Sequence, residues 1–221
     1  MNKSSIEFCD FSWNPITGCN FGCPYCWAKK FNDRYKLQNN FTVPEFHPER
    51  LNEKIPKLPK ERNFIARTIS PDKPVIFAVD MGDIFSHGVE YNWKKEIFYF
   101  ATKNPEANFL CLTKRPDFYI DWFPYIPFNT FIGTSLDFAH NKKRLEPIKE
   151  MGLKGYRTFV NIEPLMSQMD GVDFSGIDFV VVGALTGRKY RPESIWHKSI
   201  KANKIYYKTN YQVYFPELKN E

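Results

Sequence analysis

Short runs of apolar, β-branched and aromatic residues recur along the chain, and segments of helical length separate them. This alternation is typical of repeated βα units that build a parallel sheet, so the predicted fold class is α/β. Helices are expected over residues 91–103 and 140–151, with Gly152 as the stop of the second. The runs predict strands at residues 11–16, 75–79, 108–113, 130–134, 158–162, 179–182 and 204–208.

Composition narrows the class of protein. Of the 221 residues, 43% are hydrophobic and 25% are charged, which is typical of a globular chain and excludes disordered and collagen-like classes. We therefore expect one domain over residues 1–221. The longest nearly apolar run, residues 177–185, is too short for a membrane span, so no membrane partner is expected. The first residues lack the apolar core of a signal peptide, which predicts a cytoplasmic protein with reduced or ligated thiols.

The sharpest chemical signal is a group of three cysteines, Cys19, Cys23 and Cys26, in the string CNFGCPYC. Five cysteines placed at random would produce the spacing C-x3-C-x2-C with a chance of roughly 0.003. Three thiolates from one short loop suit a [4Fe–4S] cluster and leave one iron atom without a protein ligand. Unliganded thiols are one alternative. Another is a zinc site, whose distant fourth ligand would be Cys9, His47 or His87.

This cysteine spacing, with Tyr25 before the third cysteine, resembles the signature of the radical S-adenosylmethionine (radical SAM) superfamily. The strings WNPITGC, CPYCWA, LTKRP, IGTSLD, NIEPL and VVVGALTG resemble short radical SAM-like proteins of phages and prophages, whose reaction is unassigned. The resemblance implies a partial (β/α)6 TIM-like barrel, with Cys19, Cys23 and Cys26 holding the cluster in a loop at residues 17–28. It also implies that S-adenosylmethionine binds the open iron and is cleaved reductively to a 5′-deoxyadenosyl radical, with electrons from a donor such as flavodoxin or ferredoxin.

Polar residues follow the predicted strands, at the carboxyl ends where α/β folds bind ligands. By the resemblance, Tyr25 would lie against the adenine, and the segment after the second strand would receive the amino group of S-adenosylmethionine. Candidate contacts to the cofactor are Tyr25, Asp80, Gly82, Asp83, Ser135, Asp137, Asn161, Glu163 and Gly183. A solvated loop at residues 80–83 and a helix N-cap at Ser135 or Asp137 are the alternatives.

Several other residues are weaker candidates. Lys114 and Arg115 follow the third strand and could hold a carboxylate or a phosphate, or simply cap the strand. Asn14 and Thr17 precede the cysteines and could donate hydrogen bonds to the cluster or fix the loop. Cys111 could donate a hydrogen atom to a substrate radical, although a buried strand cysteine is usually inert, and Cys9 is expected to be inert. The four histidines have no metal-ligand spacing and receive no role.

The substrate is the least determined part of the function. The net charge is +6, and basic residues alternate with aromatic ones in the C-terminal segment 188–221, which makes nucleic acid or a nucleotide the leading functional hypothesis, with a solvated basic helix face as the competing interpretation. Two other classes stay open: an enzyme acting on a small metabolite or peptide, and a non-catalytic sensor or partner protein. The residues that carry the basic and aromatic pattern are Arg188, Lys189, Tyr190, Arg191, Trp196, Lys198, Lys201, Lys204, Tyr206, Tyr207 and Lys208.

Overall fold

The computed structural model describes residues 1–186 and 191–220, and the chain divides into two compact units. Unit 1 comprises Met1–Thr113 and Pro124–Thr130, and unit 2 comprises Lys114–Phe123 and Phe131–Glu221. The single domain over residues 1–221 stays a prediction. Among the described residues, no helix has both the length and the apolar character needed to cross a membrane.

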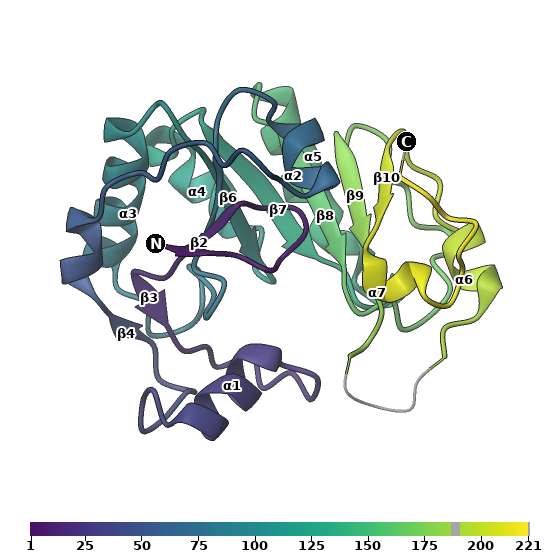
Figure 1. The fold of residues 1–221 in the computed structure, drawn as a ribbon, viewed down its shortest axis with the longest axis horizontal. Helices are drawn as coiled ribbons and strands as arrows, with labels where there is room; N and C mark the ends of the chain where they lie inside the picture. Colours follow the sequence, from purple (N-terminus) through teal and green to yellow (C-terminus); the bar gives the residue numbers. More distant parts are fainter. Residues whose placement is uncertain (187–190, 221) are drawn as a thin grey trace. The chain divides into compact units, whose positions relative to one another are not determined.

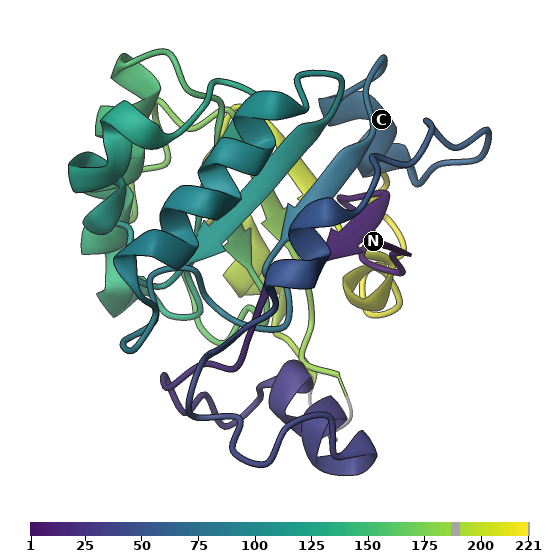
Figure 2. The ribbon, with the colours of Figure 1, turned by 90° about the vertical axis from the view of Figure 1, so that its left-hand side faces the viewer.

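Unit 1 is built on four strands in the order β1-β2-β5-β6, with β1 antiparallel to β2 and the other pairs parallel. Every residue of β5 is buried, as expected for a parallel strand covered on both faces. Trp13 stacks on Phe100 of α3, with ring centroids 4.4 Å apart, and meets Phe109 edge to face, so α3 packs on the strands (Figure 2). The elements named here are β1 (Asn2–Lys3), β2 (Phe11–Trp13), β5 (Val75–Ala78), β6 (Asn108–Thr113), η1 (Pro48–Asn52), α2 (Phe64–Ile69) and α3 (Tyr91–Lys103).

A long excursion leaves this sheet between β2 and β5. The predicted strand 11–16 ends early at Trp13, because Pro15 has no N–H to donate and Asn14 turns its side chain to Asp80 and Met81. The chain then forms a two-stranded sheet, in which β3 (Ile16–Thr17) pairs with β4 (Glu45–Phe46). Between these two strands lie the three cysteines and α1 (Trp27–Tyr35), drawn in purple in Figure 1.

Unit 2 carries strands in the order β7-β8-β9-β10, all parallel to their neighbours. Its core includes Phe159 stacked on Phe179, with Tyr206 edge to face beyond them. The elements are α4 (Phe118–Trp122), η2 (Phe123–Tyr125), β7 (Thr130–Ser135), η3 (Ala139–Arg144), α5 (Leu145–Leu153), β8 (Thr158–Ile162), β9 (Phe179–Val182), α6 (Ser194–Lys198), β10 (Ile205–Tyr207) and α7 (Thr209–Gln212).

The predicted helix 140–151 differs at both ends. Its first turns form the 3-10 helix η3, and α5 runs through Gly152 to Leu153. The predicted stop at Gly152 is therefore wrong. Gly155, with φ of 91°, takes the left-handed position that follows the helix, because a residue without Cβ adopts it at little cost.

The α/β class and the parallel pairing are confirmed, but the barrel is not. Over the described residues, β1 and β10 are edge strands, each paired with one neighbour only. The strands of neither unit form a closed barrel. The partial (β/α)6 TIM-like barrel of the radical SAM type has no support in this topology.

Candidate functional site

The cysteine loop, residues 17–28, is anchored at both ends by backbone hydrogen bonds. Gly18 donates its N–H to the carbonyl of Met81 at 3.0 Å, and Cys19 donates to the carbonyl of Phe41 at 2.8 Å. At the far end Cys26 donates to the carbonyl of Cys23 at 3.1 Å, closing a turn that leads into α1. The Cys26 sulfur also caps this helix, because it accepts the N–H of Lys29 at 3.3 Å.

All three cysteines of the loop are half-buried thiols. Cys19 and Cys26 pack against the same apolar cluster, formed by Ala28, Phe41 and Met81. Burial raises the pKa of the Cys19 thiol to about 11, and the negative charges of Asp83 and Cys23 act in the same direction, against hydrogen bonds from Phe21 and Ser86. Without a bound metal, Cys19 therefore keeps its proton at neutral pH.

This pKa predicts slow alkylation of Cys19 in the protein without metal. Because the thiolate is the nucleophile, the rate with iodoacetamide should rise about tenfold per pH unit from pH 7 and level off only near the pKa of about 11. In urea the same thiol should react at pH 7 on the order of a hundred times faster, since the exposed group returns to its ordinary pKa. Mass spectrometry of the peptide that contains Cys19 measures both rates. Equal rates in folded and unfolded protein would contradict the assigned burial.

Asp80 joins the start of the excursion to the end of β5. Its carboxylate accepts hydrogen bonds from Ser12 Oγ at 2.8 Å and from Asn14 Nδ2, and Asn14 Oδ1 in turn accepts the N–H of Met81 at 2.8 Å. Burial raises the pKa of Asp80, and these hydrogen bonds partly offset that effect. Asn14, a predicted cluster neighbour, is thus a partner of Asp80.

The segment after β5, residues 79–83, packs closely against the backbone of the cysteine loop. Gly82 forms an isolated parallel bridge with Gly18, and a Cβ at Gly82 would lie 2.9 Å from the Gly18 carbonyl oxygen. The missing side chain of Gly82 therefore makes room for the loop backbone. Val79 adopts φ of 63°, a left-handed conformation that is rare for a β-branched residue and is often found where function requires strain.

Asp83 is a carboxylate whose charge acts on the Cys19 thiol. It is buried, and it accepts hydrogen bonds from Thr113 Oγ1 at 2.7 Å and from the N–H of Phe85 at 2.9 Å. Thr113 ends β6, the strand beside β5, so its hydroxyl reaches Asp83 from a neighbouring strand end. Of the remaining predicted residues in the loop, Tyr25 is half-buried, and Thr17 Oγ1 lies 2.8 Å from His47 Nε2.

A second polar group lies at the carboxyl edge of the unit 2 sheet. Ser135 pairs in register with Asn161, which pairs with Val181. Because strand side chains alternate between faces, Asn161 and Glu163 point to the same face. Lys208 Nζ donates to both carboxylate oxygens of Glu163, at 2.7 and 2.8 Å, and Asn210 Nδ2 donates to Glu163 Oε1 at 3.2 Å.

Two features of this edge bear on ligand binding. A Cβ at Gly183 would lie 2.7 Å from Glu163 Cδ, so the glycine makes room for the carboxylate. Asn161 is 7% exposed, and within the described ranges its Oδ1 atom has no hydrogen-bond partner. A buried carbonyl oxygen without a donor is costly, so this atom marks a position where a ligand donor would be stabilised.

The remaining predicted residues of unit 2 have protein partners. Asp137 accepts from Arg144 at 3.3 Å and from Asn141 at 3.0 Å, and Lys114 Nζ lies 3.9 Å from it. Arg115 lies over the Phe118 ring, 4.4 Å from the centroid. The sequence did not predict which side chains bind these carboxylates. Arg144 binds Asp137, and Lys208 and Asn210 bind Glu163; of these three, only Lys208 was named, as part of the basic C-terminal pattern. Cys9 and Cys111, outside the cysteine loop, are both buried in unit 1.

The basic and aromatic C-terminal segment only partly matches the expected surface. Arg188, Lys189 and Tyr190 lie outside the described residues. Tyr206 is buried in the core, and Lys208 is bound to Glu163. Nucleic-acid binding stays a prediction, but the described aromatic rings of this segment contribute mainly to packing.

Across residues 1–186 and 191–220, no group of three or more Cys, His, Asp or Glu side chains is placed to hold a metal ion. In comparisons with known proteins, the profile described as "Protein of unknown function (DUF5131)" matches residues 3–215. The chain belongs to the DUF5131 family. Neither the curated proteins nor the solved structures gave a match to it.

Membership in DUF5131 corrects the family prediction made from the cysteine spacing. The matched profile is not one of the radical SAM superfamily, and the described side chains form no preassembled cluster site. The assignment to the radical SAM superfamily, including its phage and prophage members, is therefore wrong. The spacing of Cys19, Cys23 and Cys26 in this DUF5131 chain has to be explained by its own surroundings.

Proposed function

We propose that this DUF5131 protein is an iron–sulfur enzyme that uses Cys19, Cys23 and Cys26 as its metal ligands. The observation that carries the proposal is that one short anchored loop supplies three thiols. Cys19 and Cys26 pack on a common apolar cluster, and the charge of Cys23 is close enough to act on Cys19. The proposal rests on these thiols and not on the superfamily resemblance.

In the described conformation no three metal-ligating side chains surround one position, so cluster binding requires the loop to rearrange. Gly22 lies within the loop and allows this change of backbone conformation, because a glycine adopts many φ values at little cost. It has φ of 66°, and a Cβ there would meet nothing within 4 Å, so no neighbouring atom restricts the backbone at this position. Coupling of metal binding to local folding is common, because thiolates gather only when the metal compensates their mutual repulsion. The anchors at Gly18 and Cys26 would keep the two ends of the loop in place.

A bound cluster with one iron lacking a protein ligand would supply one-electron chemistry and a position for the amino and carboxylate groups of a ligand. S-adenosylmethionine is the ligand that we propose to test first. On the protein side, buried Asp83 would accept a hydrogen bond beside Cys19, and Asp80 would hold Asn14 in position. Tyr25 and Gly82 complete the proposed contacts in unit 1. The predicted contacts Ser135, Asn161, Glu163 and Gly183 are not needed for this proposal.

The proposed setting follows from the same chemistry. Half-buried cluster ligands that must stay reduced suit the cytoplasm, where a flavodoxin or ferredoxin could donate the electron. Nucleic acid or a nucleotide is the proposed substrate class, in accord with the net charge of +6. If nucleic acid and nucleotides are not substrates, the expected observation is either a modified small metabolite or peptide, or cofactor binding without turnover.

Anaerobic reconstitution with iron and sulfide tests the proposal. The wild-type protein should bind iron and sulfide with the absorption and paramagnetic spectra of a cluster, whereas Cys23→Ala should retain less than about a tenth of the iron, because two thiolates cannot hold the cluster. Cys111→Ala is the matched control, since this buried cysteine lies outside the loop, and it should bind iron like wild type.

Different results would contradict cluster binding and cleavage of S-adenosylmethionine. Equal iron in Cys23→Ala and wild type, or uptake of zinc alone, would overturn the cluster. If the cluster forms, addition of a reductant and S-adenosylmethionine should release 5′-deoxyadenosine. If the cluster forms but S-adenosylmethionine is not cleaved, with or without nucleic acid, the protein binds a cluster and is not an enzyme of this kind.

A further inference from the structure

Helix α1 presents a stripe of aromatic rings to solvent. Trp27, Phe31 and Tyr35 occur four residues apart, so they lie along one side of the helix. They are 48%, 43% and 52% exposed. Their rings follow one another, with centroids 6.4 Å apart between Trp27 and Phe31 and 4.6 Å apart between Phe31 and Tyr35. We call these three residues the α1 aromatic stripe.

The opposite side of α1 is held firmly in unit 1. Ala28 and Asn32 are buried. Asn32 exchanges two hydrogen bonds with the backbone of Gln38, at 2.9 and 3.2 Å, and the Gln38 side chain donates to the carbonyls of Asn40 and Val43. The aromatic stripe therefore stands on a braced helix, and a ligand would meet rings that are already ordered.

The charges beside the stripe are mostly positive. Lys30, Arg34 and Lys36 are exposed, and the Arg34 guanidinium lies 5.3 Å from the centroid of the Tyr35 ring. The single carboxylate of the helix, Asp33, is bound to Lys29 at 2.6 Å. An exposed surface of aromatic rings and cations complements a polyanion that presents flat π faces.

We infer that the α1 aromatic stripe binds single-stranded nucleic acid, with bases stacked on Phe31 and its neighbours and phosphates near Lys30 and Arg34. A single strand is favoured over a duplex, because only unpaired bases offer their faces for stacking. A lipid surface also attracts Trp and Phe beside basic residues, so binding to anionic vesicles is the competing outcome that the experiment below separates from binding to a single strand. This inference names where the proposed substrate class would dock, but it does not need the cluster.

Fluorescence anisotropy with labelled oligo(dT) and oligo(U), using the full chain without iron, tests the inference. Phe31→Ala should weaken binding by about five- to a hundredfold, the range expected for loss of one stacked base. Phe31→Leu should lose nearly as much, because it keeps the apolar contact but not the stacking. Tyr99→Ala is the matched control: Tyr99 is also an exposed ring beside a lysine, on α3, and should change affinity less than about twofold.

Charge variants and competing surfaces complete the test. Lys30→Gln should lower the slope of log affinity against log salt by about 0.7, the value for one phosphate contact on a single strand. Wild-type affinity in Phe31→Leu, equal losses in Phe31→Ala and Tyr99→Ala, or binding only to anionic lipid vesicles would each overturn the inference. Because iron is absent throughout, these results are independent of whether the cysteine loop holds a cluster.

Discussion

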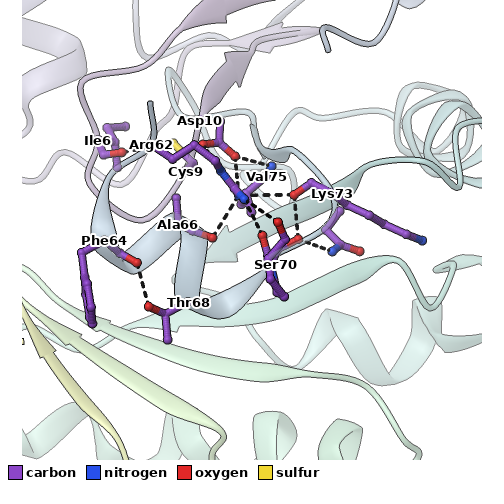
Figure 3. Close-up of polar contacts among 12 residues, drawn as sticks. Ile6, Cys9, Asp10, Arg62, Phe64, Ala66, Thr68, Ser70, Lys73 and Val75 are labelled. Carbon is purple, nitrogen blue, oxygen red and sulfur yellow. Dashed lines mark hydrogen bonds and ion pairs between the residues drawn. The ribbon is translucent and has the colours of Figure 1, made fainter. Parts of the chain in front are cut away.

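Replacement of Arg62 by methionine is expected to lower the free energy of unfolding by about 3–5 kcal/mol, because it leaves a buried carboxylate without its partner. Arg62 and Asp10 form an ion pair whose side chains are 4% and 2% exposed. The guanidinium donates to both oxygens of Asp10, from Nε at 2.9 Å and from Nη2 at 2.8 Å (Figure 3). This bidentate geometry is the strong form of such a pair.

The pair also organises the backbone around it. Arg62 donates to the carbonyl oxygens of Ser70 at 2.7 Å, Ala66 at 3.1 Å and Lys73 at 3.3 Å, while Asp10 Oδ2 accepts the N–H of Val75 at 2.8 Å (Figure 3). One side chain thus satisfies carbonyls at the end of α2 and in the turn before β5. Loss of Arg62 would remove these hydrogen bonds together with the charge partner of Asp10, although the Ala66 carbonyl still accepts the N–H of Ser70 and the Lys73 carbonyl still accepts the Ser70 hydroxyl.

Chemical denaturation of Arg62→Met measures the effect. Arg67→Met is the matched control, because Arg67 is an exposed arginine on α2, the helix that follows Arg62, and its replacement should change stability by less than about 0.5 kcal/mol. The double variant Asp10→Leu with Arg62→Met should recover part of the loss, since no unpaired charge remains. Equal stabilities of Arg62→Met and Arg67→Met would show that this network contributes little to the fold.

Gly18→Ala is expected to destabilise the base of the cysteine loop by about 3 kcal/mol or more, through left-handed backbone strain together with steric overlap. Gly18 has φ of 88°, and a Cβ there would lie 2.7 Å from the Val43 carbonyl oxygen and 3.0 Å from that of Phe41. These are backbone atoms that cannot rotate away. They also accept the hydrogen bonds of Gln38 and Cys19 that hold the loop.

Gly22→Ala provides the comparison within the same loop. Its φ is 66°, but a Cβ at this position would have nothing within 4 Å, so only the conformational cost of about 1–2 kcal/mol applies. Denaturation curves and iron uptake after reconstitution should both separate the two variants: Gly22→Ala should lose only about 1–2 kcal/mol and take up iron like wild type, whereas Gly18→Ala should lose more stability and take up less iron. Similar behaviour of the two would mean that the anchor at Gly18 does not position the cysteines.

Much of the fold was readable from local pattern. Runs such as 108–113 and 158–162 match β6 and β8, because consecutive β-branched and aromatic residues suit a strand buried on both faces. Helix α3 was predicted at its observed limits, because the segment between two predicted strands has helical length. The helix α1 was missed, since it has only nine residues and its aromatic side faces solvent, which removes the usual pattern.

The candidate sites were only partly readable. The spacing of Cys19, Cys23 and Cys26 was visible, but whether the thiols converge depends on contacts with Phe41 and Met81, which lie far along the chain. Glu163 was singled out as a carboxylate at a strand end. Its partner Lys208 is 45 residues away along the chain. The two side chains meet because Glu163 follows β8 and Lys208 follows β10, and only β9 lies between these strands in the sheet.

The sequence by itself determined the α/β class, the parallel strands and the presence of three thiols in one short loop, because these depend on composition and on spacing within a few residues. The tertiary structure decided which groups meet. It brought Asp80 to Asn14 and Arg62 to Asp10, it left the described side chains without a preassembled metal site, and it turned the α1 rings outward. The physical reason is that such pairings depend on strand register and loop anchors between distant segments, and short-range pattern does not specify these.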